Sequence, residues 1–177
     1  MIVAVAHNKG GVGKTTTVVQ LAGELKPEII IDLDAHQGIA IINGRRPVEQ
    51  RWDVRAGLEK AALIKLLKAA GDHLVLIDCG GFDSELVRIA IAAADLIIAP
   101  SNDEITEQIG LVRFNQGYCA QFTDKFHENY FSYIIHIDSG LESNVSAYHR
   151  RSVPSSHAFA STLQLHKSAS RCISDSS

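Results

Sequence analysis

The sequence contains few of the features that stabilise or target secreted and membrane-spanning proteins. Three of its 177 residues are cysteines, Cys79, Cys119 and Cys172, and they are widely spaced. An odd number of such residues fits a reducing cytoplasm better than a framework of disulfides. The chain lacks any run of about 18 apolar residues, so no membrane span is expected. It starts directly on an apolar run, with no basic leader or cleavage site, and we expect no signal peptide.

An excess of charge of either sign is also missing. The formal net charge is −3 and 46% of the residues are apolar. Bulk charge therefore does not indicate a nucleic-acid partner, although a local basic patch is not excluded. A chain of this length can bury a sizeable core, and we expect a single domain over residues 1–177. Serine supplies nine of the 26 residues at 152–177, which predicts a divergent and partly disordered tail.

One stretch dominates what is present. Residues 9–16 read Lys-Gly-Gly-Val-Gly-Lys-Thr-Thr, between an apolar run at 2–6 and a segment of helical periodicity at 18–25. Strand, glycine loop and helix form the context of a phosphate-binding loop. Glycines let backbone N–H groups turn inward around a polyphosphate, and the start of a helix adds unpaired N–H groups. The predicted phosphate-binding residues are Gly10, Gly11, Val12, Gly13, Lys14, Thr15 and Thr16.

Further residues in and beyond this loop suit the binding of phosphate and Mg²⁺. Lys14 supplies a point charge for the outer phosphates, and the hydroxyl of Thr15 is placed to ligate Mg²⁺. Asp78 ends a run of four apolar residues, the pattern of a Walker B acid that holds Mg²⁺. Gly80 and Gly81 then form a flexible loop of the kind that senses a terminal phosphate.

Apolar runs alternate with helical patterns along the chain. Strands that read as continuous apolar runs are buried on both faces, which indicates a parallel sheet with helices on either side. We therefore predict an α/β fold with a mostly parallel, twisted sheet and helices on both faces. Polar residues follow the strands at the edge where such sheets bind ligands. The predicted strands lie at 2–6, 29–34, 74–78, 96–100 and 131–137, with a further short strand at 51–54; a turn lies at 44–47, and the helices follow the loop and lie at 58–70, 84–94 and 104–118.

The loop departs from the standard phosphate-loop pattern. Asn8 stands where the first glycine would be, and a second lysine, Lys9, lies just inside. This string resembles the deviant Walker A loop of the ParA/MinD ATPases, and the resemblance covers roughly residues 1–140. It is strongest to short plasmid-type ParA proteins and implies a P-loop NTPase fold with ATP and Mg²⁺ as cofactors. In that family the early lysine reaches across a homodimer to the partner's nucleotide, which implies a catalytic role for Lys9 beside Lys14.

A second acid-bearing stretch strengthens the resemblance. Residues 32–38 read Asp-Leu-Asp-Ala-His-Gln-Gly, where the family has Asp-x-Asp-Pro-Gln-Gly. The resemblance implies that Asp34 orients the attacking water and that Asp32 supports the metal held by Thr15 and Asp78. Ala35 replaces the proline, so the role of the glutamine falls to Gln37, one residue late, or to His36. By its chemistry His36 is a candidate general base, but an ordinary loop histidine is the better interpretation.

The implied function is a slow, partner-stimulated ATPase that dimerises on ATP and acts as a switch in plasmid or chromosome partitioning. In the family, the ATP dimer binds DNA non-specifically and a ParB-like adaptor stimulates hydrolysis. The protein is then expected in the cytoplasm, associated with the nucleoid. In the family the DNA contacts come from the C-terminal region. Here that region has four cations, which are few for a surface that contacts several phosphates. Adenine contacts also come from that region, with Asp138 or Ser139 as candidates; the cations are Arg150, Arg151, Lys167 and Arg171.

Other functions stay open. A MinD-like positioning protein needs a C-terminal amphipathic helix with a bulky apolar face, which the Ser-rich tail argues against. A conjugation-accessory ATPase would use the same motifs. A remnant that binds nucleotide without further function is suggested only by the tail. A metabolic or metal-cluster-carrying ATPase would need a C-x-x-C that the sequence lacks.

Some residues are better explained as structural. Cys79 lies next to Asp78, whereas cluster-binding relatives place the cysteine several residues further on, so it is interpreted as a small strand-end residue. His7 is expected to pack or cap beside the loop. Metal-ligand spacing is absent around Trp52 and the histidines His73, His127, His136, His149 and His157. Arg45 and Arg46 form a further basic pair, for which a solvated surface is the commoner explanation.

Overall fold

The structure is a computed structural model, and it describes residues 1–81, 83–101, 105–114, 131–136 and 145–147. Several predictions fall outside this range and remain predictions. They concern the Ser-rich tail at 152–177, the four cations Arg150, Arg151, Lys167 and Arg171, and the adenine-contact candidates Asp138 and Ser139.

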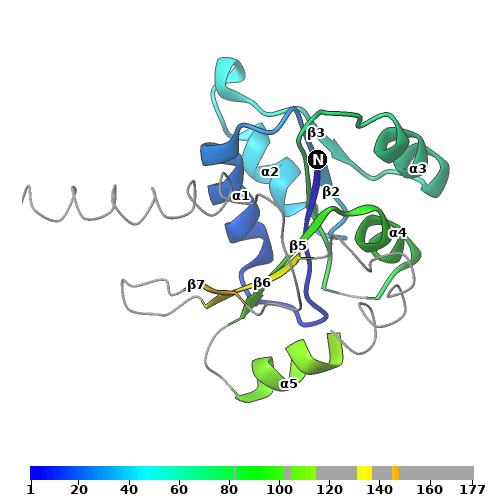
Figure 1. Cartoon of the computed structure of the whole chain (residues 1–177). Coiled ribbons are helices and arrows are strands. Elements are labelled where there is room, and N and C mark those ends of the chain that lie inside the picture. The colour runs from blue at the N-terminus through cyan, green and yellow to red at the C-terminus, as the bar shows by residue number, and fades with distance from the viewer. Residues whose placement is uncertain (82, 102–104, 115–130, 137–144, 148–177) are drawn as a thin grey trace, which may run out of the picture.

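A sheet of seven described strands forms the centre of the fold, in the order β3-β2-β4-β1-β5-β6-β7 (Figure 1). Neighbouring strands are parallel, except that β7 is antiparallel to β6. The prediction of a mostly parallel sheet is therefore confirmed. The strands are β1 (Ile2–Val5), β2 (Ile29–Asp32), β3 (Val54–Ala56), β4 (Val75–Asp78), β5 (Leu96–Ser101), β6 (Phe131–His136) and β7 (Val145–Ala147).

Helices cover both faces of the sheet, as expected (Figure 1). On one face lie α1 (Lys14–Leu25) and α2 (Gly38–Gly44), which is followed by the 3-10 turn η1 (Val48–Gln50). On the other face lie α3 (Lys60–Lys68) and α4 (Glu85–Ala93). A further helix, α5 (Ile105–Phe114), reaches the second face through its last residue, Phe114.

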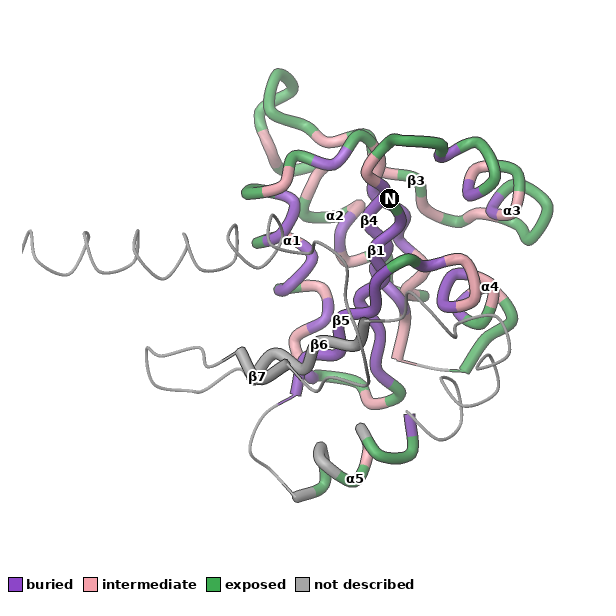
Figure 2. Tube along the Cα trace, viewed as in Figure 1, coloured by how far each residue is buried: buried purple, intermediate pink, exposed green. Residues whose placement is uncertain are grey.

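The central strand β1 explains why the core has two halves. Its side chains alternate between the faces, because successive residues of a strand point in opposite directions. Val3 and Val5 join the cluster beneath α1 and α2, whereas Ile2 and Ala4 join the one beneath α3 and α4. All four β1 residues are buried, and Figure 2 shows the central strands as the buried part of the fold. Burial on both faces is the physical reason for the continuous apolar runs in the sequence.

Most element boundaries agree with the sequence patterns. Ser84, the first residue of the helix predicted at 84–94, is the N-cap of α4, since its hydroxyl oxygen accepts a hydrogen bond from the Val87 N–H at 3.2 Å. Gly71 follows α3 with a φ of +50°, a left-handed conformation that favours glycine. The predicted helix at 104–118 is helical over its described part, residues 105–114.

The sequence patterns predicted the two ends of the sheet less well than its centre. The short strand expected at 51–54 lies at 54–56, where it pairs with β2. Helix α2 was not predicted, because a segment of seven residues that begins and ends with glycine carries little helical signal. Gly44 ends this helix, and the turn predicted at 44–47 begins one residue later, at Arg45. The strand β7, antiparallel at the opposite end of the sheet, was not predicted either.

Candidate functional site

The glycine loop between β1 and α1 has the backbone that phosphate binding requires. Gly11 and Gly13 have φ angles of +79° and +87°, in the left-handed region that residues with a Cβ rarely adopt. Gly13 is the N-cap of α1, and no side chain caps this helix end. The N–H groups of the first turn and the positive end of the helix dipole are therefore presented to an anion.

Lys14 lies at the base of this loop with its side chain 6% exposed. Its ammonium group donates a hydrogen bond to the Lys9 carbonyl oxygen at 2.8 Å. Burial lowers the pKa of Lys14, and the negative charges of Asp78 and Asp34 oppose that effect. A bound polyphosphate would add negative charge beside an ammonium group that burial has deprived of water.

Thr15 and Asp78 meet directly. The Thr15 hydroxyl donates to Asp78 Oδ2 at 2.8 Å. Asp78 is fully buried, and its other oxygen, Oδ1, has no hydrogen-bond partner in the described part of the chain. Burial is the largest cause that raises the pKa of Asp78 to about 7; the Thr15 hydrogen bond opposes it, and the nearby charges of Asp32 and Asp34 add to it. A hydroxyl beside a desolvated carboxylate oxygen is a donor set that suits Mg²⁺.

The two acids after β2 have different surroundings. Asp32 is buried and uses both carboxylate oxygens on backbone N–H groups, those of Asp34 and Ala40, each at 3.1 Å. Asp34 is half-buried, and its Oδ1 accepts a hydrogen bond from the His36 N–H at 2.8 Å. The structure therefore gives Asp32 a clear part in holding the loop and α2. Asp34 is the acid of the pair that is closer to solvent.

The loop after β4 fits between the phosphate loop and the loop that carries Asp34. A Cβ added to Gly81 would lie 3.3 Å from both the Cα and the N of Gly10, and 3.5 Å from Lys14 Nζ. A Cβ on Gly80 would lie 3.3 Å from the Leu33 carbonyl oxygen and 3.4 Å from the Asp34 Cα. A side chain at either glycine would push neighbouring backbone away by a few tenths of an ångström, so the loop that was expected to sense a phosphate lies against both predicted parts of the site.

Helix α2 begins beside Thr15. A Cβ on Gly38 would lie 3.2 Å from Thr15 Cγ2 and 3.7 Å from its hydroxyl oxygen. Gln37, the residue before it, has a φ of +50°, and its side-chain nitrogen lies 3.6 Å from the Cβ position of Gly57. The side chain of His36 is exposed. Thus Gln37 lies at the start of α2, one residue from the Gly38–Thr15 contact.

A second set of contacts, which the sequence patterns did not predict, joins the phosphate loop to α5. His7 is buried; its Nδ1 accepts a hydrogen bond from the Lys9 N–H at 3.0 Å, and its ring stacks on Phe114 with the planes 4° apart. The expectation that His7 packs or caps is confirmed. The Lys9 ammonium donates to the Thr106 hydroxyl oxygen at 3.2 Å. These contacts depend on how α5 packs, which no residue spacing in the sequence indicates.

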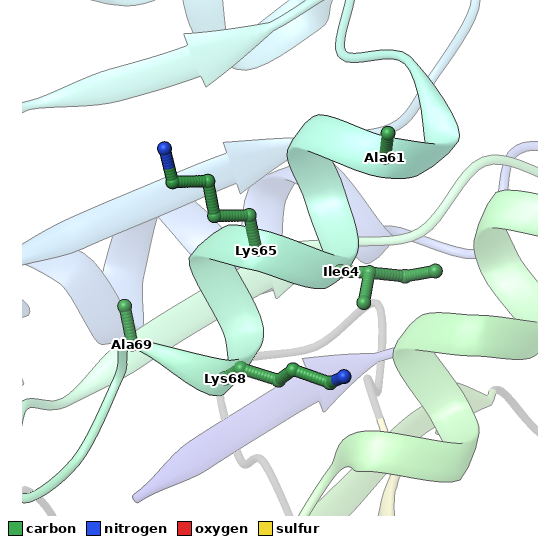
Figure 3. A pocket seen from close by; sticks show the side chains of 5 residues that line it. All are labelled: Ala61, Ile64, Lys65, Lys68 and Ala69. Atoms are coloured by element: carbon green, nitrogen blue, oxygen red, sulfur yellow. The ribbon is translucent and has the colours of Figure 1, made fainter.

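Elsewhere, other features offer no competing site in the described part of the chain. An open hollow on the outer face of α3 contains none of the predicted site residues (Figure 3); it is lined by Ala61, Ile64, Lys65, Lys68 and Ala69. Cys79 is a buried free thiol. The described residues include no group of three or more His, Cys, Asp or Glu side chains that could hold a metal ion, and none of their helices has the length and apolar character to span a membrane.

Comparisons with known proteins found similar sequences and a similar fold. The family model described as an AAA domain matches residues 1–50. Protein ParA from Rhizobium radiobacter is 30% identical over 105 residues, which cover 56% of this chain and 47% of the relative. The maintenance of carboxysome distribution protein A from Gloeobacter kilaueensis is 31% identical over 104 residues, which cover 56% of this chain and 48% of that protein. The chain thus spans about half the length of the curated relatives it matches.

A solved structure extends the likeness to the fold. The cobyrinic acid a,c-diamide synthase of Mycobacterium smegmatis, determined with bound ADP and magnesium, has a TM-score of 0.60 at 22% identity, over 79% of this chain and 76% of that one. At this identity the likeness concerns the fold alone. The family-model match includes the phosphate loop, which lies within residues 1–50. Together with the loop at 9–16, the sequence matches show that this chain is similar to ParA-type proteins over about half of its length.

Proposed function

We propose that this protein is an Mg²⁺-dependent ATPase that dimerises on ATP and acts as a molecular switch in plasmid or chromosome partitioning. In this proposal the ATP-bound dimer binds DNA non-specifically in the cytoplasm, and a ParB-like adaptor stimulates a slow hydrolysis. The proposal rests on the site geometry, on the ParA relative and on the deviant phosphate loop.

The observation that carries the ATPase proposal is the pair Thr15–Asp78. It combines a hydroxyl and a buried carboxylate oxygen without a partner in the described structure, next to an uncapped helix and a buried lysine. Mg²⁺ in such sites is held by one or two protein oxygens together with substrate phosphates. Thr15 and Asp78 would hold the ion, which would supply positive charge beside the outer phosphates. Asp32 would support Asp78 from the neighbouring strand, where the two residues are in register.

The residues of the loop bind and orient the nucleotide. The N–H groups of Gly10 to Thr16 would surround the phosphates, as backbone groups at a helix N-terminus do. Lys14 would exchange its hydrogen bond to the Lys9 carbonyl for the phosphate oxygens, because a buried ammonium gains more from an anion than from a neutral carbonyl. Gly80 and Gly81 lie against the phosphate loop and the loop that carries Asp34, so a change in the bound phosphates would displace them.

Hydrolysis would depend on two further side chains. Asp34 has one oxygen occupied by the His36 N–H, and its Oδ2 lies 3.8 Å from the Cβ position of Gly80. From there it would position the attacking water, as charge-assisted hydrogen bonds can do. Lys9 would leave Thr106 and reach the nucleotide of the partner protomer, where its charge would stabilise the transition state.

A second candidate is a positioning ATPase of the MinD or conjugation-accessory type that does not act through DNA. One observation favours it, since a relative of similar identity is named for the distribution of carboxysomes, a cargo other than DNA. The fold alone does not decide between these functions.

The experiment that tests the proposal is sedimentation with random-sequence DNA in the presence of no nucleotide, ADP or ATP with Mg²⁺. Partitioning predicts retention with ATP alone, weakened about a thousandfold or more between about 50 and 200 mM salt if several phosphates are contacted. The Lys14→Ala variant is the matched control and should lose retention. ATP hydrolysis without retention on DNA under any condition would instead favour the second candidate, and normal hydrolysis by Lys14→Ala would contradict the site itself.

A further inference from the structure

Residues 38–52 form a projecting corner next to β3, and we call this segment the α2 corner (Figures 1 and 2). It exposes large aliphatic side chains: Ile41 is 55% exposed, Ile42 39% and Val48 74%. The same segment carries three arginines, Arg45, Arg46 and Arg51, but a single acidic residue, Glu49, in a chain whose net charge is −3. The corner is therefore both apolar and locally basic.

The exposed side of α2 is well defined. Ile41 and Ile42 lie four and three residues before Arg45, the spacings that place side chains on the same side of a helix. Ile39 lies almost opposite Ile41 around the helix and is fully buried in the core, and Ile42, between them, is the less exposed of the two outer isoleucines. The side chain of Arg45 makes no hydrogen bond or ion pair with the described residues. Two isoleucines and an available cation thus face solvent together.

The rest of the corner is held in one conformation. The Asn43 amide donates to the Trp52 carbonyl at 3.0 Å and accepts from the Trp52 N–H at 2.9 Å. The Arg51 guanidinium donates to the carbonyl oxygens of Gly44, at 2.9 Å, and Arg46, at 3.1 Å. The Arg46 guanidinium stacks over the Trp52 ring, 3.9 Å from its centroid. A surface organised in this way loses little conformational entropy when it is covered.

We propose that the α2 corner docks an acidic, amphipathic segment of a partner protein. The apolar side of that segment would cover Ile41, Ile42 and Val48, and its carboxylates would pair with the arginines. Complementary charge favours an acidic partner. Exposed aliphatic side chains favour protein over nucleic acid, because contacts to a phosphate backbone are polar.

The position of α2 also couples this surface to the nucleotide site, an extension that rests on the proposed function. The Cβ position of Gly38, the first residue of α2, lies 3.2 Å from Thr15 Cγ2. Asp32 holds the next part of the helix through the Ala40 N–H. A rearrangement at Thr15 or Asp32 on nucleotide binding therefore moves α2, and a partner on the α2 corner binds with different affinity in the two states.

The chain offers its own reporter for this proposal. Trp52 is its one tryptophan, so the intrinsic fluorescence of the protein reports on the α2 corner. The probe is a synthetic helical peptide of about 18 residues, without tryptophan, with leucine on one face and glutamate on the other. A peptide with lysine in place of glutamate is the matched control. We expect the glutamate peptide to bind the full chain and shift the Trp52 emission, and the lysine peptide to do neither; equal binding of the two peptides would overturn the proposal.

Substitutions locate the binding. Arg45→Glu and Ile41→Ser should each lower the affinity for the glutamate peptide about tenfold, the usual size of an effect at a central contact. Lys65→Glu, the same charge reversal at an exposed position in the α3 hollow (Figure 3), should leave its affinity unchanged. Arg45 and Ile41 are both exposed, so neither substitution should unfold the protein, and circular dichroism checks this. Ile42→Ser serves as a second variant if Ile41→Ser does not fold. Loss of affinity in Lys65→Glu alone, or binding of a DNA duplex that depends on Arg45 but not on Ile41, would overturn the assignment.

The coupling is tested separately, with AMPPNP and Mg²⁺ binding measured by calorimetry. If AMPPNP binds and changes both the Trp52 emission and the affinity for the peptide, the coupling is supported. If it binds and changes neither, the coupling is wrong although the proposed function stands. If it does not bind, the proposed function fails, and the peptide affinities still decide whether the α2 corner is a docking surface.

Discussion

The Thr15 hydroxyl and the Asp78 carboxylate share a 2.8 Å hydrogen bond that satisfies one of the two carboxylate oxygens and leaves Oδ1 buried without a partner in the described structure. Burial raises the pKa of Asp78 from 3.8 to about 7. The folded protein therefore binds this proton more tightly than the unfolded chain does. The contribution of Asp78 to stability is greatest below about pH 4 and decreases as the pH rises towards 7.

This relationship predicts that Asp78→Asn stabilises the nucleotide-free protein and abolishes Mg²⁺-dependent hydrolysis. An amide carries no charge to desolvate, so the free energy of unfolding at pH 8 should rise, on the order of 2 kcal/mol. Urea denaturation with EDTA, repeated from about pH 5 to 8, measures the effect. Asp53→Asn, at an exposed acid paired with Arg55, is the control and should change little. A variant as sensitive to pH as the wild type would show that Asp78 is not the group that titrates.

Lys14→Met separates charge from packing at the base of the loop. The apolar stem remains while the ammonium is lost, so affinity for ATP should fall about a hundredfold or more, a loss of roughly 3 kcal/mol. Stability without nucleotide should stay equal or increase, because burial opposes the charge on Lys14. Calorimetric titration and thermal unfolding measure the two effects. Lys60→Met, at an exposed lysine that pairs with Glu85, should leave ATP binding intact.

The sequence predicted the sheet well because its central strands are buried on both faces. Strands β1, β2, β4 and β5 are continuous apolar runs, and that pattern results directly from burial. Strand β3 has three residues that are at most half-buried, with Arg55 in the middle, so neither periodicity nor apolar content revealed its place. Helix α2 starts after a left-handed Gln37 and carries no side-chain cap, which removed the usual start signal.

The sequence predicted those parts of the candidate site that depend on the conformation or chemistry of one residue type. Gly11 and Gly13 have the positive φ angles expected of the loop, and Thr15 at the start of α1 meets Asp78 at the end of β4. The sequence did not indicate that both carboxylate oxygens of Asp32 accept backbone hydrogen bonds. One of them comes from the Ala40 N–H, which belongs to the unpredicted helix α2. The contacts of Lys9 with Thr106 likewise depend on how α5 packs, and residue spacing does not encode that packing.

The two acids after β2 should respond differently to the same substitution. Asp34→Asn should bind ATP normally and hydrolyse it about a hundredfold more slowly, because the amide orients water without a charge. Asp32→Asn should instead destabilise the protein by about 1–3 kcal/mol, since one of its two backbone N–H groups would lose its acceptor. Single-turnover hydrolysis and urea denaturation distinguish these outcomes. Unchanged turnover in Asp34→Asn would leave Asp34 with a purely structural role.

Gly81→Ala tests whether the loop after β4 must touch the phosphate loop. The added Cβ would lie 3.3 Å from the backbone N and Cα of Gly10, and two backbone segments relieve such a contact only by moving apart. A displacement of a few tenths of an ångström in the phosphate loop should reduce ATP affinity about tenfold. Gly23→Ala is the matched control: it lies within α1 with no heavy atom near its Cβ position, so it should leave affinity unchanged and stabilise the helix by about 0.5–1 kcal/mol. If both variants bind ATP like the wild type, the two loops are not in contact when nucleotide is bound, and Gly81 does not belong to the phosphate-sensing part of the site.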